Sequence, residues 1–162
     1  MIHAVKTRRT LTTILVAWLL AGTLDITTAI VYYIGASAAG TERLLQGIAS
    51  GVLGAAAFTG GAATAVLGLL LHYLIALIWT LVLFAAFKAV TALRRHLVLT
   101  GIAYAVVVWF AMNLIVLPLS SVRRAPLRLG PAIVAAVILV FCIGLPISLV
   151  VGRLFRDPTS AR

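Results

Sequence analysis

The chain has 162 residues, of which 64% are hydrophobic and 10% are charged, and its formal net charge is +10. A soluble domain is roughly half apolar and roughly one quarter charged, so this composition excludes an ordinary soluble protein. The single cysteine, Cys142, excludes an internal disulfide framework. We therefore predict one all-helical integral membrane domain over residues 1–162.

Four apolar runs are long enough to cross a bilayer, which takes about 20 mostly apolar residues. The first run could be taken for a secretion signal, but it continues past the usual length and lacks a small-x-small cleavage pattern. We expect it to remain as the first of four transmembrane helices. Pro118 closes the third run and Pro131 opens the fourth, where a proline suits a first helical turn. The four predicted spans cover residues 11–34, 62–87, 97–117 and 131–151.

A fifth apolar stretch, residues 44–60, is rich in glycine and alanine and runs almost directly into the second span. One helix from 44 to 87 would be about 66 Å long, roughly twice the thickness of the hydrocarbon core. We expect it to break at Thr59-Gly60-Gly61, because glycine tolerates irregular backbone. The piece that remains is slightly short for a crossing, so a re-entrant helix, an interfacial helix and a fifth span are all open.

The distribution of Lys and Arg favours four spans with both termini in the cytoplasm. Four spans place nine of these residues inside and four outside, as the positive-inside rule expects, whereas five spans give six against seven. The positive charge then belongs to loops that face the cytoplasm and anionic lipid. We expect no nucleic-acid binding, because no soluble segment interleaves a basic patch with aromatic residues. The inner set is Lys6, Arg8, Arg9, Lys88, Arg94, Arg95, Arg153, Arg156 and Arg162, and the outer set is Arg43, Arg123, Arg124 and Arg128.

Three strongly polar side chains lie inside the predicted spans: Asp25, His72 and Asn113. In the four-span topology all three fall in the outer half of the bilayer, roughly 4–9 Å from its midplane. A carboxylate costs roughly 2.5–3.5 kcal/mol at the centre of a membrane helix, so Asp25 needs partners. We predict that Asp25 pairs with His72 and that Asn113 satisfies the remaining lone pairs. Thr28 and Tyr32 extend the same helix face.

This polar cluster has two interpretations. Polar side chains in membranes often form interhelical hydrogen bonds that fix packing and contribute on the order of 0.6–2 kcal/mol each. Intramembrane carboxylates also mark ion and proton paths. In that case Asp25 and His72 form a protonatable pair beside a wet cavity.

A glycine recurs every seven residues at Gly47, Gly54, Gly61 and Gly68. Gly51 completes the element Gly47-x-x-x-Gly51. Small residues let helix backbones approach closely, so we predict that this stripe packs against another helix. The same stripe would suit a dimer seam, or a half-helix whose N–H groups face a small anion. The predicted packing residues are Gly47, Gly51, Gly54, Gly61 and Gly68.

Short motifs that carry the polar residues, the glycines and the prolines cover most of the chain. They are Gly22-Thr23-Leu24-Asp25, Leu45-Gln46-Gly47-Ile48-Ala49-Ser50-Gly51, Gly60-Gly61, His72-Tyr73-Leu74-Ile75-Ala76, Met112-Asn113-Leu114, Leu117-Pro118-Leu119-Ser120 and Gly144-Leu145-Pro146. In these motifs the chain resembles a group of small, uncharacterised bacterial inner-membrane proteins. The resemblance implies a bacterial inner membrane and a four-helix architecture, and it implies no substrate and no catalytic residue.

The sequence contains no Ser-His-Asp arrangement, metal-spaced Cys/His set, phosphate loop or HExxH motif. We therefore expect no catalytic residue, no metal and no cofactor, and an intramembrane enzyme ranks last. One prediction is a small channel or transporter for an ion, a proton or a small polar solute. The alternative is a non-catalytic accessory or assembly subunit of a larger membrane complex. The expected partners are the lipid bilayer and either further copies of the chain or such a complex.

Overall fold

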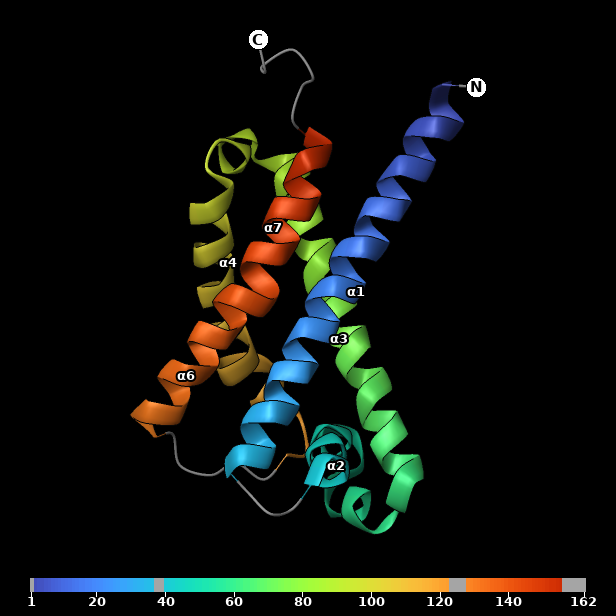
Figure 1. The fold of residues 1–162 in the computed structure, drawn as a ribbon, viewed down its shortest axis with the longest axis vertical. Coiled ribbons are helices and arrows are strands. Elements are labelled where there is room, and N and C mark those ends of the chain that lie inside the picture. The colour runs from blue at the N-terminus through green and yellow to red at the C-terminus, as the bar shows by residue number, and fades with distance from the viewer. Residues whose placement is uncertain (1, 37–39, 123–127, 156–162) are drawn as a thin grey trace.

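The structure is a computed structural model that describes residues 2–36, 40–122 and 128–155, with the side chains of residues 2–6, 35 and 36 outside the description. Within these ranges every regular element is a helix, and four helices are long and apolar enough to cross a membrane. A shorter helix lies between the first two (Figure 1). This confirms the predicted all-helical bundle of four membrane helices plus a short one. The four candidate spans are Thr7–Ile34, Gly61–Ala89, Leu97–Leu119 and Leu129–Phe155.

The first two long helices are continuous, and the other two are not. The first is α1 (Ile2–Ala36), and the second is α3 (Gly61–Ala89). A 3-10 turn, η2 (Thr91–Arg94), leads from α3 to the third span. The third span consists of α4 (Leu97–Ala111), the π turn η3 (Met112–Val116) and α5 (Leu117–Leu119). The fourth consists of α6 (Leu129–Leu139), the π turn η4 (Val140–Gly144), α7 (Leu145–Gly152) and the 3-10 turn η5 (Arg153–Phe155).

Both π turns come immediately before a Leu-Pro pair. Proline lacks an N–H, and its ring collides with the carbonyl group four residues earlier in a regular α-helix. For Pro118 and Pro146 those carbonyl groups belong to Leu114 and Cys142, which lie inside η3 and η4. The wider turn removes the collision without ending the helix, so each span continues past its proline.

The short helix α2 (Gly40–Leu53) and the 3-10 turn η1 (Gly54–Thr59) stay at one end of the bundle. The end of α1 and the start of α3 lie at that same end, so this segment does not cross as a fifth span (Figure 1). The chain turns at Gly54 and again at Gly61, whose φ angles of 59° and 57° favour glycine. Gln46 joins α2 to the start of α3, because its Nε2 donates to the Gly61 carbonyl oxygen over 3.2 Å.

The best-packed part of the bundle lies in the half where α3 ends and α4 begins. The largest fully buried side chains are there, among them Leu83, Phe87 and Ile147. Arg94 closes the end of α3 by donating from Nε to the Phe87 carbonyl oxygen over 2.6 Å, and its guanidinium lies over the Phe155 ring. In the other half, at the α2 end, no described residue of η3, α5 or α6 is buried.

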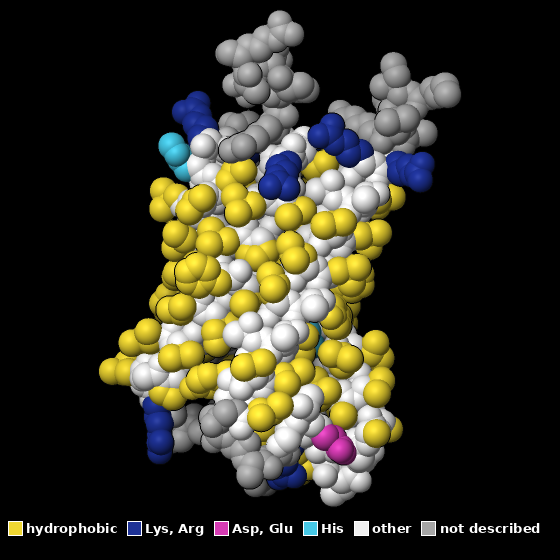
Figure 2. All heavy atoms as spheres, in the orientation of Figure 1, with side chains coloured by type: hydrophobic (Ala, Val, Ile, Leu, Met, Phe, Trp, Pro, Cys, Tyr) yellow, Lys and Arg dark blue, Asp and Glu magenta, His cyan; other side chains and the backbone are white. Residues whose placement is uncertain are grey.

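The surface has the pattern of a membrane-embedded protein. Apolar side chains cover the flank of the molecule, and Lys and Arg side chains gather at its two ends (Figure 2). The exposed apolar residues include Leu70, Leu99 and Phe141, each more than 60% exposed. In water such a surface would be unstable, whereas in lipid it is the expected covering. The chain is therefore a small membrane-embedded helical protein.

Candidate functional site

The contact between α1 and α3 fixes where the candidate site lies along the axis of the bundle. Gly22 lies so close to Tyr73 that a Cβ there would come within 2.9 Å of the Tyr73 ring. Three hydrogen bonds surround this contact. The His72 Nε2 donates to the Gly22 carbonyl oxygen over 2.9 Å, the Trp18 Nε1 donates to the Tyr73 carbonyl oxygen over 2.7 Å, and the Thr23 and Tyr73 hydroxyls lie 2.9 Å apart. Asp25, less than one turn beyond Gly22, is thereby held at the level of His72.

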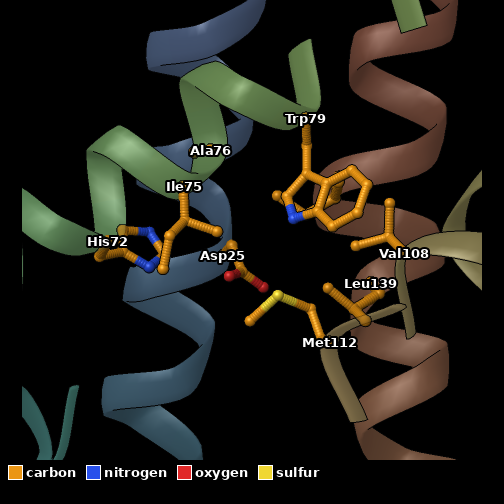
Figure 3. Close-up of a pocket in the computed structure, with 9 residues that line it drawn as sticks. Asp25, His72, Ile75, Ala76, Trp79, Val108, Met112 and Leu139 are labelled. Carbon is orange, nitrogen blue, oxygen red and sulfur yellow. The ribbon is translucent and has the colours of Figure 1, made fainter. Parts of the chain in front are cut away.

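Asp25 and His72 line one partly open cavity of about 80 Å³ between the spans. All four spans contribute to its wall. The Asp25 side chain points into the cavity between His72 and Met112, and the Trp79 indole closes the side toward the packed core (Figure 3). The remaining lining is apolar and consists of Ile75, Ala76, Trp79, Val108, Met112, Leu139 and Ile143.

The two titratable groups of the cavity are held in different ways. A carbonyl oxygen only accepts, so the hydrogen bond to Gly22 means that the His72 Nε2 carries a proton. Asp25 has no comparable anchor, since no residue that the structure describes donates a hydrogen bond to its carboxylate or forms an ion pair with it.

Asn113, the third residue of the predicted cluster, is not part of the cavity wall. Its Nδ2 donates to the Trp109 carbonyl oxygen one turn earlier in the same helix, over 2.8 Å. The neighbouring residue Met112 lines the cavity instead. The structure thus brings Asp25 and His72 together and directs Asn113 to its own backbone, a common local alternative for short polar side chains.

The two further polar residues on α1 lie toward the α2 end. The Thr28 hydroxyl is 3.4 Å from the Cys142 sulfur, which places it against η4. Tyr32 is 48% exposed. The polar face that starts at Asp25 therefore reaches Thr28 inside the bundle and turns outward at Tyr32.

The five glycines of the predicted packing stripe have different surroundings. At Gly68 a Cβ would collide with the Leu45 carbonyl oxygen, so the α2 and α3 backbones touch there. The Gly51 carbonyl oxygen accepts a hydrogen bond from the Ser121 N–H over 3.0 Å. Gly54 and Gly61 occupy the two turns with positive φ, and a Cβ at Gly47 would meet nothing within 4 Å.

The prediction did not include several residues that shape the cavity. A Cβ at Gly144 would collide with the Gly101 carbonyl oxygen, so α4 and η4 pack backbone against backbone just beside the lining residue Ile143. Trp79 and Met112 were also missed as lining residues. One sequence signal was available. Leu117-Pro118-Leu119-Ser120 and Leu145-Pro146-Ile147-Ser148 are near-copies, and each follows a segment that contributes to the cavity wall.

No protein-family model matches the chain, and searches of curated proteins and of solved structures find no match either. Within the described ranges no group of three or more His, Cys, Asp or Glu side chains is placed to hold a metal ion. What the cavity offers is one carboxylate, one imidazole and an apolar wall.

Proposed function

We propose that the protein is a small membrane transporter or channel whose working site is the cavity that contains Asp25 and His72. One observation carries the proposal: an acid and an imidazole from two different helices line the same partly open cavity. A carboxylate that no fixed cation balances attracts a proton or a mobile cation. Exchange of that occupant is the elementary step of transport.

Other polar groups of the bundle show what a purely structural role looks like. The Thr80 hydroxyl donates to the Ala76 carbonyl oxygen, and the Ser148 hydroxyl donates to the Leu97 carbonyl oxygen across to α4. Both hydroxyls are buried and fully partnered. Asp25 differs because its carboxylate faces a space and not a donor, which supports a functional role over a packing role.

The uneven packing of the bundle supports access to the cavity from the α2 end. Toward the other end, the path is filled by fully buried apolar side chains such as Leu83, Phe87 and Val151. Toward the α2 end, α6 and η3 bury no described residue. The buried residues at the α2 end belong to α2, η1 and α3, so a path on that side would run past α6 and η3.

We further propose that the protein lies in a bacterial inner membrane with its termini in the cytoplasm, as the resemblance and the charge distribution both suggest. Among the side chains that the structure describes, six cations lie at the end where α1 begins and two lie at the α2 end. The first set is Arg8, Arg9, Lys88, Arg94, Arg95 and Arg153, and the second is Arg43 and Arg128. Arg123, Arg124, Arg156 and Arg162 lie outside the described residues, and so does the side chain of Lys6. This bias matches the positive-inside rule.

A proton-flux assay tests the proposal. Purified protein is reconstituted into liposomes that contain a pH-sensitive dye, and lumenal pH is followed after an external pH jump. We expect flux from the wild type, and a loss of roughly tenfold to a hundredfold in Asp25→Asn, which removes a charged interaction but keeps the shape. Glu42→Gln is the matched control, because it removes a carboxylate at the exposed end of α2.

Two outcomes would contradict the proposal. Equal flux in the wild type and Asp25→Asn would leave the carboxylate without a role in transport. An inactive wild type that always co-purifies with a larger complex at a fixed ratio would favour an accessory subunit.

A further inference from the structure

We infer that the cavity binds a small organic monocation of the alkylammonium class, an inference that rests on the proposed transport function. It follows from three properties of the cavity: its charge, its lining and its size. Each excludes a different group of occupants.

The charge of the cavity selects a cation. Asp25 is the one carboxylate in the wall, and no described Lys or Arg lines the cavity to balance it. A buried carboxylate is costly unless an opposite charge or a proton accompanies it. The other polar side chain of the wall, His72, uses its Nε2 for the Gly22 carbonyl oxygen and is not a fixed cation. A proton satisfies Asp25 without any ligand, so a ligand that completes the site with Asp25 ionised carries one positive charge.

The lining argues against a hydrated inorganic cation. Hard metal ions take about six or more oxygen ligands. The cavity side chains provide only the two carboxylate oxygens of Asp25, and seven of the nine lining residues are apolar. An alkylammonium ion has the opposite needs, because its N–H groups donate to one carboxylate and its alkyl groups require apolar contact. A largely apolar wall with one or two well-placed polar groups is what small-molecule sites have.

The size limits the ligand to a few heavy atoms. The cavity of about 80 Å³ is several times the roughly 10–15 Å³ that one water molecule needs by the same measure, so it admits a small organic ion. Methylammonium and its near relatives fit this space. Trp79 and Met112 lie near the Asp25 carboxylate (Figure 3), and an indole and a thioether are polarizable neighbours for an organic cation.

Calorimetric titration of the purified protein with methylammonium chloride tests the inference. We expect saturable binding to the wild type, affinity lowered by roughly tenfold or more in Asp25→Asn, and unchanged affinity in Glu42→Gln. Sodium and potassium at the same concentrations should not compete. Near-native thermal unfolding of Asp25→Asn would show that the loss of affinity does not come from misfolding.

A second variant tests whether the ligand occupies this cavity. Met112→Ala enlarges the space beside the carboxylate and keeps the charge. We expect the preferred ligand to shift from methylammonium toward propylammonium and butylammonium. A general loss of structure would weaken all of these ligands together and would not reverse their order.

The outcomes separate this inference from the proposed function. If the wild type does not bind methylammonium but shows Asp25-dependent proton flux, the organic cation is wrong and transport stands. If methylammonium binds through Asp25 but the liposomes show no flux, of protons or of radiolabelled methylammonium, the ligand class stands and transport is wrong. Binding that Asp25→Asn leaves unchanged would overturn the assignment of the ligand to this cavity.

Discussion

At the scale of single residues, the site depends on how one histidine is held. The His72 Nε2 donates to the Gly22 carbonyl oxygen, which fixes the orientation of the ring. Gly22 is required twice, because its carbonyl oxygen accepts this bond and its missing Cβ makes room for Tyr73. The positioning of His72 and its chemistry can therefore be separated by substitution.

Two substitutions of His72 make that separation. In His72→Gln the side-chain amide can still donate to the Gly22 carbonyl oxygen, but it cannot accept a proton. We expect near-native stability and a large loss of proton flux. In His72→Ala the Gly22 carbonyl oxygen loses its side-chain donor, so we expect a further destabilisation of about 1–3 kcal/mol. Unfolding in detergent and the liposome assay measure the two effects, and wild-type flux in His72→Gln would reduce His72 to a packing residue.

At the scale of elements, the third and fourth spans share one design. Each widens into a π turn before a Leu-Pro pair, and each contributes lining residues at or beside that turn. The two spans are joined by the backbone contact between Gly101 and Gly144. Close glycine contacts of this kind give membrane helices much of their van der Waals attraction. The contact therefore holds the cavity wall in place.

Substitution of Gly144 tests this element. Even the methyl group of Gly144→Ala would collide with the Gly101 carbonyl oxygen, so α4 and η4 must separate. We expect a destabilisation of about 1–3 kcal/mol in detergent unfolding, as for other overpacked sites. Gly130→Ala in the same span is the control, because a Cβ there meets nothing within 4 Å, and it should change stability by less than about 0.5 kcal/mol. Equal stability of the two variants would contradict the close contact.

At the scale of the whole molecule, the sequence predicted the class of fold and not the detail of the site. Hydrophobic length and glycine placement were enough for four membrane helices and a short one, because the bilayer imposes both. Comparing residue depths placed Asp25 and His72 at one level, as the structure does. Depth could not show that Met112 would face the cavity while Asn113 bonds to its own helix, because that depends on the π turn at Met112–Val116.

The orientation of the molecule is open to a direct test. Ala92→Cys lies in the exposed turn between α3 and α4, and Ala55→Cys lies in the exposed part of η1 at the other end. We expect a membrane-impermeant maleimide to label Ala55→Cys in intact spheroplasts and to label Ala92→Cys only after permeabilisation. The wild-type chain is the background control, since its Cys142 is buried. The reverse pattern would invert the proposed topology.

The paired π turns also change how the outer faces of these helices are assigned. A π turn holds one residue more than an α-helical turn, and one residue corresponds to about 100° around the axis. A helical wheel drawn straight through Met112–Val116 or Val140–Gly144 therefore misdirects every later side chain by about 100°. In the third span this affects only the short α5, whereas the fourth span needs two wheels, one before η4 and one after it, before any lipid-facing stripe is compared between related chains.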